Sequence, residues 1–149
     1  MIQVVQVPVA DVVDLRARVL RAGRPRESAA FEGDYDPATV ALAVFADDVC
    51  GPAATTTLLV QACPWLPDLA ATRLRGMATD PVARRRGLGA ALVAEAIARS
   101  RAAGAAVLWC HARLGAAGLY RSAGFEVAGP PFEVEGIGPH LHMHHRLQG

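Results

Sequence analysis

A strand pattern that passes into a helix pattern through two glycines constrains this chain more than any other feature. Residues 73–79 have the composition of a strand, and residues 87–103 repeat apolar side chains at helical spacing. Gly87 and Gly89 stand at the start of that helix, and Gly104 is a natural stop after it. The apolar helix positions are Leu88, Ala91, Leu92, Ala96 and Ile97. This succession predicts a domain in which strands and helices are mixed.

The rest of the chain continues the alternation. Strands are predicted at residues 2–7, 40–46, 49–60, 105–110, 125–128 and 141–147. Helices are predicted at residues 11–21 and 114–122, and glycine or proline follows each of them. Residues 24–37 and 63–68 are predicted as loops, and Pro52 makes a regular strand less secure at its position. We therefore expect an α/β fold of the mixed α+β kind, formed as a single domain over residues 1–149.

The composition fits one soluble domain. The chain has 149 residues, a formal net charge of +1, 52% apolar residues and 19% charged residues. No apolar run approaches the ~18 residues that a membrane span needs. The N-terminus has neither the basic head nor the cleavage site of a signal peptide. We therefore expect no membrane association and a cytoplasmic location.

Two residue types limit the available chemistry. Cys50, Cys63 and Cys110 form an odd set without CxxC spacing, which argues against a disulfide framework and a structural zinc site. All 15 basic residues are arginine, so a P-loop and a pyridoxal phosphate enzyme, which both need lysine, are excluded. The near-neutral charge, with no aromatic residues interleaving the arginine run at residues 84–86, disfavours a nucleic-acid partner.

The segment at residues 80–90 carries the clearest chemical signal. Gly87 and Gly89 permit close approach of the backbone to a ligand. A helix start presents unpaired N–H groups and a positive dipole end, and the arginine run adds positive charge. These features predict an anion site that suits a pyrophosphate. A dinucleotide-binding fingerprint is rejected, because its third glycine and its later acidic residue are both missing.

The same segment resembles the signature of the GNAT superfamily of N-acetyltransferases. That signature is Arg or Gln, two residues, Gly, one residue, then Gly or Ala, and residues 84–89 fit it. Residues 116–125 resemble the family's Ala-xxx-Tyr-xxx-Gly-Phe segment, and residues 74–81 resemble its strand that carries acetyl-CoA. The resemblance implies a GNAT-like fold, with a twisted mixed sheet of six or seven strands flanked by about four helices.

The resemblance also implies roles for individual residues, with acetyl-CoA as the cosubstrate. The strand would bind the pantetheine arm through its backbone, and the helix start would bind the pyrophosphate through its N–H groups. Tyr120 would lie near the sulfur and protonate the leaving thiolate. The family often has Asn where this chain has Arg113. The expected cofactor-binding residues are Met77, Ala78, Thr79, Arg84, Arg85, Arg86, Gly87, Leu88, Gly89, Ala90, Arg113 and Tyr120.

Candidate acceptor residues lie in two places. Glu32, Asp34 and Asp36 form an acidic cluster that would attract a cationic amine, and a solvated acidic loop is the alternative. His140 follows a Gly-Ile-Gly-Pro stretch that resembles the end of a subset of small GNAT proteins. We expect His140 to deprotonate or orient the amine, with Glu32 and Asp34 as competing bases. Glu32, Asp34 and His140 are thus the expected acceptor contacts, and Tyr120 and His140 the expected catalytic residues.

Further histidines follow His140. On a strand, His140, His142 and His144 share one face, and two histidines so spaced can bind zinc. No third ligand from another element is evident, so no metal is expected and a polar strand face is the alternative. Trp65, in a proline-flanked loop, either walls the acceptor pocket or packs in the core.

The expected function is that of an N-acetyltransferase, EC 2.3.1.-. It would move an acetyl group from acetyl-CoA to a primary amine, preferably of a small molecule, by direct attack in a ternary complex. Two alternatives stay open: a non-catalytic acyl-CoA-binding or regulatory module, and acetylation of a protein amine. A homodimer is also open, and the sequence does not specify the amine or the length of the acyl group.

Overall fold

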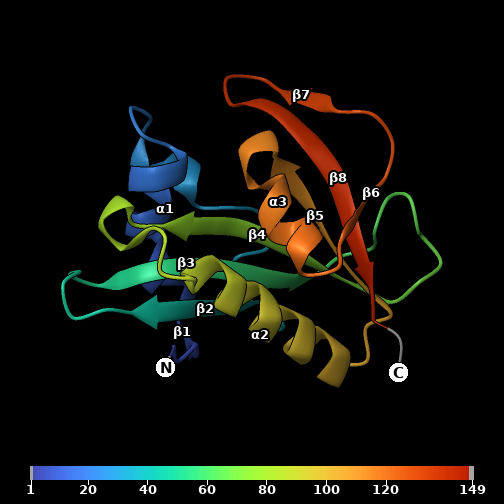
Figure 1. Cartoon of the computed structure of the whole chain (residues 1–149), viewed down its shortest axis with the longest axis horizontal. Helices are drawn as coiled ribbons and strands as arrows, with labels where there is room; N and C mark the ends of the chain where they lie inside the picture. Colours follow the sequence, from blue (N-terminus) through green and yellow to red (C-terminus); the bar gives the residue numbers. More distant parts are fainter. Residues whose placement is uncertain (1, 148–149) are drawn as a thin grey trace. The chain divides into compact units, whose positions relative to one another are not determined.

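The structure, a computed structural model, describes residues 2–147 (Figure 1). In this range the strands are β1 (Val5–Val7), β2 (Val40–Phe45), β3 (Pro52–Val60), β4 (Ala71–Thr79), β5 (Val107–Arg113), β6 (Glu126–Val127), β7 (Phe132–Val134) and β8 (Gly138–Arg146). The α-helices are α1 (Val13–Leu20), α2 (Leu88–Ala102) and α3 (Ala117–Ser122). Short 3-10 turns occupy Val9–Val12, Arg26–Ala29, Pro81–Ala83 and Leu114–Ala116. Hydrogen bonding orders the strands β1-β2-β3-β4-β5-β8-β6, with β7 paired to β8.

The described chain divides into two compact units. Unit 1 comprises the residues up to Leu59 together with Leu74–Glu95. Unit 2 comprises Val60–Arg73 and the residues from Ala96 onward. The cofactor residues predicted on β4 and at the start of α2 therefore lie in unit 1, and Tyr120 and His140 lie in unit 2.

Unit 1 contains an antiparallel ladder in which β2 pairs with β1 and β3. Residues 53–59 of β3 are all buried, so both faces of this strand are covered. Leu15 of α1 contributes a fully buried side chain to the same unit. The β2–β3 register shifts between Val44 and Phe45, and Phe45 lies opposite Pro52. Proline has no N–H to donate, which explains why regular pairing ends there.

Unit 2 is built around the β5–β8 ladder. These strands run antiparallel, from Val107 opposite Arg146 to Arg113 opposite His140. The first three residues of β4 pair with β5 in parallel, and β6 and β7 pair with different stretches of β8. α3 packs against β5 (Figure 1).

Two of the glycines that follow predicted helices form left-handed helix ends. Gly104 after α2 has a φ of 88°, and Gly124 after α3 has a φ of 100°. The N–H groups of Ala105 and Phe125 then donate to carbonyls in the last helical turns, each at 3.0 Å. This arrangement is the left-handed C-cap that favours glycine.

The mixed α/β fold class is confirmed, with differences in the number of elements. The described residues form eight strands rather than six or seven, because β7 lies in the connection predicted to have none. β7 is held by pairing with β8. They form three α-helices rather than about four, and the remaining helical segments are 3-10 turns of three or four residues. Among the described residues, no helix is both long and apolar enough to cross a membrane.

Candidate active site

The backbone between β4 and α2 has an unusual conformation at the predicted phosphate site. Arg85 has a φ of 65° and Gly87 a φ of 78°, so two left-handed residues stand just before the helix. Such a conformation costs a residue with a side chain about 1–2 kcal/mol and costs glycine little. α2 begins at Leu88, and the N–H of Ala91 makes its first hydrogen bond, to the carbonyl of Gly87 at 3.1 Å.

The backbone N–H groups of residues 85–90 have no acceptor among residues 2–147. They form an uninterrupted series that includes the first turn of a 15-residue helix. Unpaired N–H groups and the positive end of a helix dipole together bind phosphate groups well. This segment therefore fits the pyrophosphate of acetyl-CoA.

Asp80 and Pro81 set the turn that leads to these N–H groups. The Asp80 carboxylate accepts from the Val82 N–H at 3.0 Å and from Arg18 Nη1 at 2.9 Å. Its backbone N–H donates to the carbonyl of Ala53 in β3 at 2.8 Å. The hydrogen bond from Arg18 lowers the pKa of Asp80 below its usual value. The sequence interpretation missed Asp80, although an aspartate before proline is a recognised signal for the start of a helical turn.

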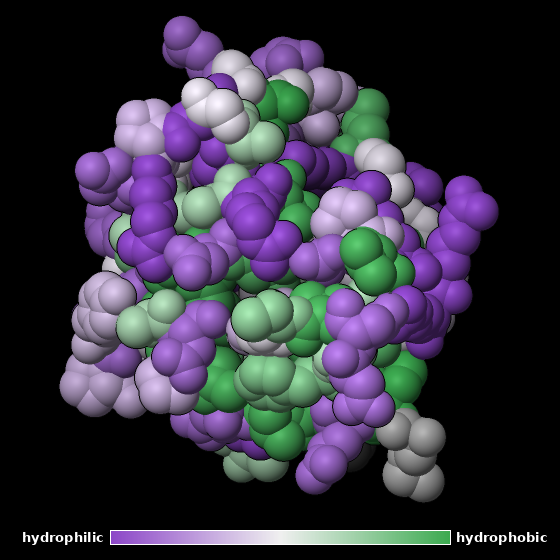
Figure 2. All heavy atoms as spheres, turned by 90° about the vertical axis from the view of Figure 1, so that its left-hand side faces the viewer, coloured by the Kyte–Doolittle hydropathy of each residue, from purple (hydrophilic) through white to green (hydrophobic). Residues whose placement is uncertain are grey.

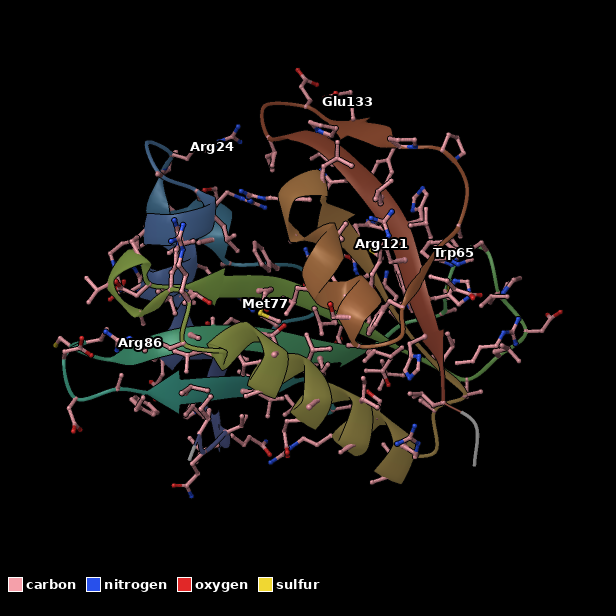
Figure 3. All side chains as sticks on the ribbon, viewed as in Figure 1. Arg24, Trp65, Met77, Arg86, Arg121 and Glu133 are labelled. Atoms are coloured by element: carbon pink, nitrogen blue, oxygen red, sulfur yellow. The ribbon has the colours of Figure 1, made fainter. Side chains whose placement is uncertain are left out.

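The three arginines of the predicted site are not equivalent. Arg86 forms a two-pronged ion pair with Asp48, at 2.9 and 2.7 Å (Figure 3). This pairing lowers the pKa of Asp48 and raises that of Arg86. Arg84 and Arg85 are exposed and make no ion pair within the described part of the chain. They are therefore the arginines available to phosphate groups. Figure 2 shows one face of the molecule, on which hydrophilic and hydrophobic side chains are mixed.

The predicted pantetheine-binding residues are Met77, Ala78 and Thr79, in the second half of β4. Gly76, which precedes them, has a φ of 68°, as glycine does where a strand is locally irregular. A Cβ atom at Gly76 would lie 3.0 Å from Nε of Arg16 and 3.2 Å from the ring of Phe31. The close approach and the positive φ both require glycine here. A glycine inside a strand pattern is a signal that could have identified Gly76 from the sequence.

Asp34 is not an open acidic group. Its two oxygens accept from Arg16 at 2.8 and 3.1 Å, and one also accepts from the Phe31 N–H at 2.7 Å. The Arg16 and Asp34 side chains are only 0% and 2% exposed. Arg16 also donates to Thr57 Oγ1 at 2.7 Å and to the carbonyl of Ala29 at 3.1 Å. This geometry does not support the expected acceptor contact, because Asp34 is used to fix the loop after α1.

Glu32 and Asp36 are the exposed members of the predicted acidic cluster. The main-chain carbonyl of Glu32 accepts from Arg75 at 3.3 Å. The neighbouring Phe31 ring lies 4.3 Å from the guanidinium of Arg16 and 4.4 Å from that of Arg75. Cation–π contacts therefore hold this loop from two sides. Of the three acidic side chains in the predicted cluster, Glu32 and Asp36 are the ones exposed to an acceptor.

Tyr120 is on α3, where it is 3% exposed and packs against the ring of Phe125 at 5.4 Å. Burial raises the pKa of Tyr120 well above its ordinary value, so its phenol stays protonated at neutral pH. Burial also raises the pKa of Cys110 on β5 to about 12. At neutral pH Tyr120 thus keeps its hydroxyl proton, and Cys110 stays an inert thiol.

His140 lies opposite Arg113 in the β5–β8 ladder. Its Nδ1 is 2.9 Å from the carbonyl oxygen of Gly138. A carbonyl can only accept, so Nδ1 carries a proton, and in the neutral ring Nε2 has the lone pair. His140 can therefore accept a proton at Nε2. Burial lowers the pKa of Arg113 beside it.

His142 and His144 follow on the same strand face as His140, opposite His111 and Trp109 of β5. The indole N–H of Trp65 donates to Nδ1 of His144 at 2.9 Å, so Trp65 packs on this face. Among residues 2–147, no three or more His, Cys, Asp or Glu side chains are grouped to hold a metal ion.

Comparison with known proteins places the chain in a family. The family described as "Acetyltransferase (GNAT) domain" matches residues 68–147. The N-acetyltransferase YitI of Bacillus subtilis (strain 168), itself uncharacterized, is 32% identical over 148 residues, covering 99% of this chain and 98% of that protein. The chain therefore belongs to the GNAT family of acetyltransferases.

Solved structures share the fold. A protein from Lactobacillus plantarum described as an N-acetyltransferase has a TM-score of 0.79 and 21% identity, over 99% of each chain. The ribosomal-protein-S18-alanine N-acetyltransferase of Escherichia coli has a TM-score of 0.72 and 19% identity, over 100% of this chain and 96% of that one. At these identities the likeness concerns the fold alone.

Proposed function

We propose that residues 1–149 act as one N-acetyltransferase domain that moves an acetyl group from acetyl-CoA to a primary amine, with a small molecule as the preferred acceptor. The observation that carries this proposal is the series of unpaired N–H groups at residues 85–90, in front of α2. It supports binding of a diphosphate. Family membership then indicates that the diphosphate is part of an acyl-CoA.

The proposed reaction is a direct transfer. The amine nitrogen attacks the carbonyl carbon of the thioester, a C–N bond forms and the C–S bond breaks. The proton lost by the amine goes to Nε2 of His140, and the hydroxyl of Tyr120 gives a proton to the departing thiolate. Solvent then returns a proton to Tyr120 and removes one from His140. The raised pKa of Cys110 argues against an acyl-enzyme on this cysteine.

The proposal is tested by a screen of amines for release of free CoA thiol from acetyl-CoA. The panel contains polyamines, amino acids, aminoglycosides and short peptides, so it also compares small molecules with peptide amines. We expect release of CoA thiol that depends on one class of amine. The amount of acetylated amine should equal the amount of thiol released. Acetyl-CoA binding without product from any class would instead favour a non-catalytic acyl-CoA-binding module.

Replacing His140 with glutamine should lower kcat/KM at neutral pH by about 10²-fold or more, since glutamine cannot accept a proton. The parent should lose activity as the pH falls, because protonated His140 is no longer a base. The variant should lack this acid limb. The measurement is the pH profile of kcat/KM with the best amine from the screen.

His145 provides a matched control on the same strand. Its Nδ1 is 3.0 Å from the carbonyl of Gly124, so it is held in the same way as His140 but has no proposed role. The His145→Gln variant should keep the parental profile. An acid limb of unchanged position and height in the His140→Gln variant would exclude His140 as the base.

A further inference from the structure

Five rings form a continuous cluster on the His140 face of unit 2. We call them the ring cluster: Trp65, Trp109, His111, Phe132 and His142. The centroid of Trp65 is 5.5 Å from that of Trp109 and 4.8 Å from that of His142. Phe132 stacks on His142 at 4.1 Å, with 14° between the planes. All but Trp109 are only partly buried, so the cluster presents part of its ring surface to an apolar ligand.

Arg73 is the cation of this cluster. Its guanidinium lies 4.9 Å from the centre of the Trp109 ring. It donates to Oε1 of Gln61 at 3.2 Å and contacts Nδ1 of His111 at 3.4 Å. Its Nε is buried without a hydrogen-bond partner, and no carboxylate pairs with Arg73 among residues 2–147. Burial lowers the pKa of Arg73, since the charge has lost water without gaining an anion.

The neighbouring imidazoles add no charge of either sign. Arginine can only donate, so Nδ1 of His111 accepts from Arg73 and this ring is neutral. An indole N–H can only donate, so Nδ1 of His144 accepts from Trp65. His144 must then donate through Nε2 to Glu126, 3.0 Å away, and is neutral as well. Arg73 is thus the cation of the cluster that has no carboxylate partner among the described residues, and one carboxylate would match it.

We propose that the ring cluster and Arg73 bind the acceptor, and that the acceptor is an amine that also carries a carboxylate and an apolar, preferably aromatic, group. The carboxylate pairs with Arg73 and the apolar group contacts Trp65 and Phe132. This proposal rests on the proposed function, because an acceptor exists only for a transferase. It names a zwitterionic acceptor, in contrast to the purely cationic amine that the acidic loop suggests.

The register sets the spacing of the two polar groups in the acceptor. Arg73 lies opposite Trp109, and His140 lies opposite Arg113, four residues further along β5. Four residues span about 13 Å at ~3.3 Å per residue. The guanidinium of Arg73 reaches Nδ1 of His111, two residues along β5, whereas the His140 ring contacts the carbonyl of Gly138 at the far end. The amine and the carboxylate are therefore several bonds apart, as in a short peptide or an ω-amino acid.

A fluorescence titration tests the site without acetyl transfer. The chain contains 2 tryptophans, and both belong to the ring cluster, so intrinsic fluorescence reports on this face. The probes are phenylacetate and phenylacetamide, which share a ring and differ in charge. We expect a saturable change with phenylacetate and about tenfold or more weaker binding of phenylacetamide, because only the carboxylate forms a charge-assisted pair.

Arg73→Gln should abolish the preference for phenylacetate. The matched control is Arg121→Gln, which removes one positive charge from the exposed end of α3 in the same unit (Figure 3). It should keep the preference. Equal affinity of the parent for both probes would overturn the proposal, and this comparison needs no variant to fold. A preference for phenylacetate that persists in a folded Arg73→Gln variant would also overturn it. So would a shift of the emission maximum that depends on protein concentration and not on the probe.

An activity comparison separates this proposal from the proposed function. With a carboxylate-bearing acceptor and its amide, Arg73→Gln should raise KM for the carboxylate form only and leave kcat unchanged. Equal KM values for the carboxylate acceptor and its amide would overturn the assignment of Arg73 but not the transferase function. Selective probe binding without transfer to any amine would overturn the transferase, and with it the role of this face as an acceptor site.

Discussion

Replacing Tyr120 with phenylalanine is expected to lower kcat by about 10²- to 10⁴-fold, the usual contribution of a general acid. The variant keeps the ring that packs against Phe125 at 5.4 Å and removes only the hydroxyl. Because burial raises the pKa of Tyr120, the parent holds this proton throughout the neutral range. The thiolate would then leave without a proton donor. The measurement is the single-turnover rate with saturating acetyl-CoA and amine.

The dissociation constant for acetyl-CoA, measured beside the single-turnover rate, defines the role of the hydroxyl. The dissociation constant for acetyl-CoA should stay within about twofold of the parental value, because the side chain is needed for the proton and not for affinity. An undiminished single-turnover rate would assign Tyr120 to packing alone.

The raised pKa of Tyr120 also predicts a stability effect with a definite sign. The unfolded chain ionises its tyrosines near pH ~10, whereas folded Tyr120 resists ionisation. The parent should therefore lose stability as the pH rises above about 10, and Tyr120→Phe should lose less.

Changing Asp34 to asparagine is expected to lower the free energy of unfolding by about 3–5 kcal/mol, the cost of breaking a buried ion pair. Arg16 has a fully buried side chain and would keep its charge without a counterion. Asparagine keeps one acceptor oxygen, and its NH2 group would face a donor in place of the other, either Arg16 or the Phe31 N–H. Urea denaturation followed by circular dichroism gives the change.

Asp36 serves as the matched control for this substitution. It is exposed and lies in the same loop, so Asp36→Asn should change the free energy of unfolding by only about 0.5 kcal/mol. Equal effects at the two positions would contradict the structural role of the Arg16–Asp34 pair and return Asp34 to the candidate acceptor contacts.

Elements with a strong local pattern could be predicted from the sequence. The periodicity of residues 87–103 identified α2, whose observed bounds are Leu88–Ala102. Gly104 and Gly124 marked helix ends, because the left-handed C-cap is a local requirement for glycine. The segment before α2 was predicted as an anion site for a similarly local reason, since unpaired N–H groups follow from any helix start.

Features that depend on distant residues could not be predicted. β7 has only three residues and is held by β8, so its own pattern is too short to indicate a strand. The acidic loop looked open because the partner of Asp34 is on α1, 18 positions away. Arg73 appeared only as a strand residue, since its partners Gln61 and His111 are separated from it by 12 and 38 positions. Such pairings are set by the tertiary fold.

The central claim is that the backbone at residues 85–90 binds the diphosphate of acetyl-CoA, and calorimetric titration of acetyl-CoA tests it most directly. Gly87→Val should weaken binding about tenfold or more, because valine does not tolerate a φ of 78° and the N–H groups would be displaced. Gly104→Val imposes the same strain at a φ of 88° at the other end of α2 and should bind like the parent. Equal affinity of the parent and both folded variants would contradict the claim.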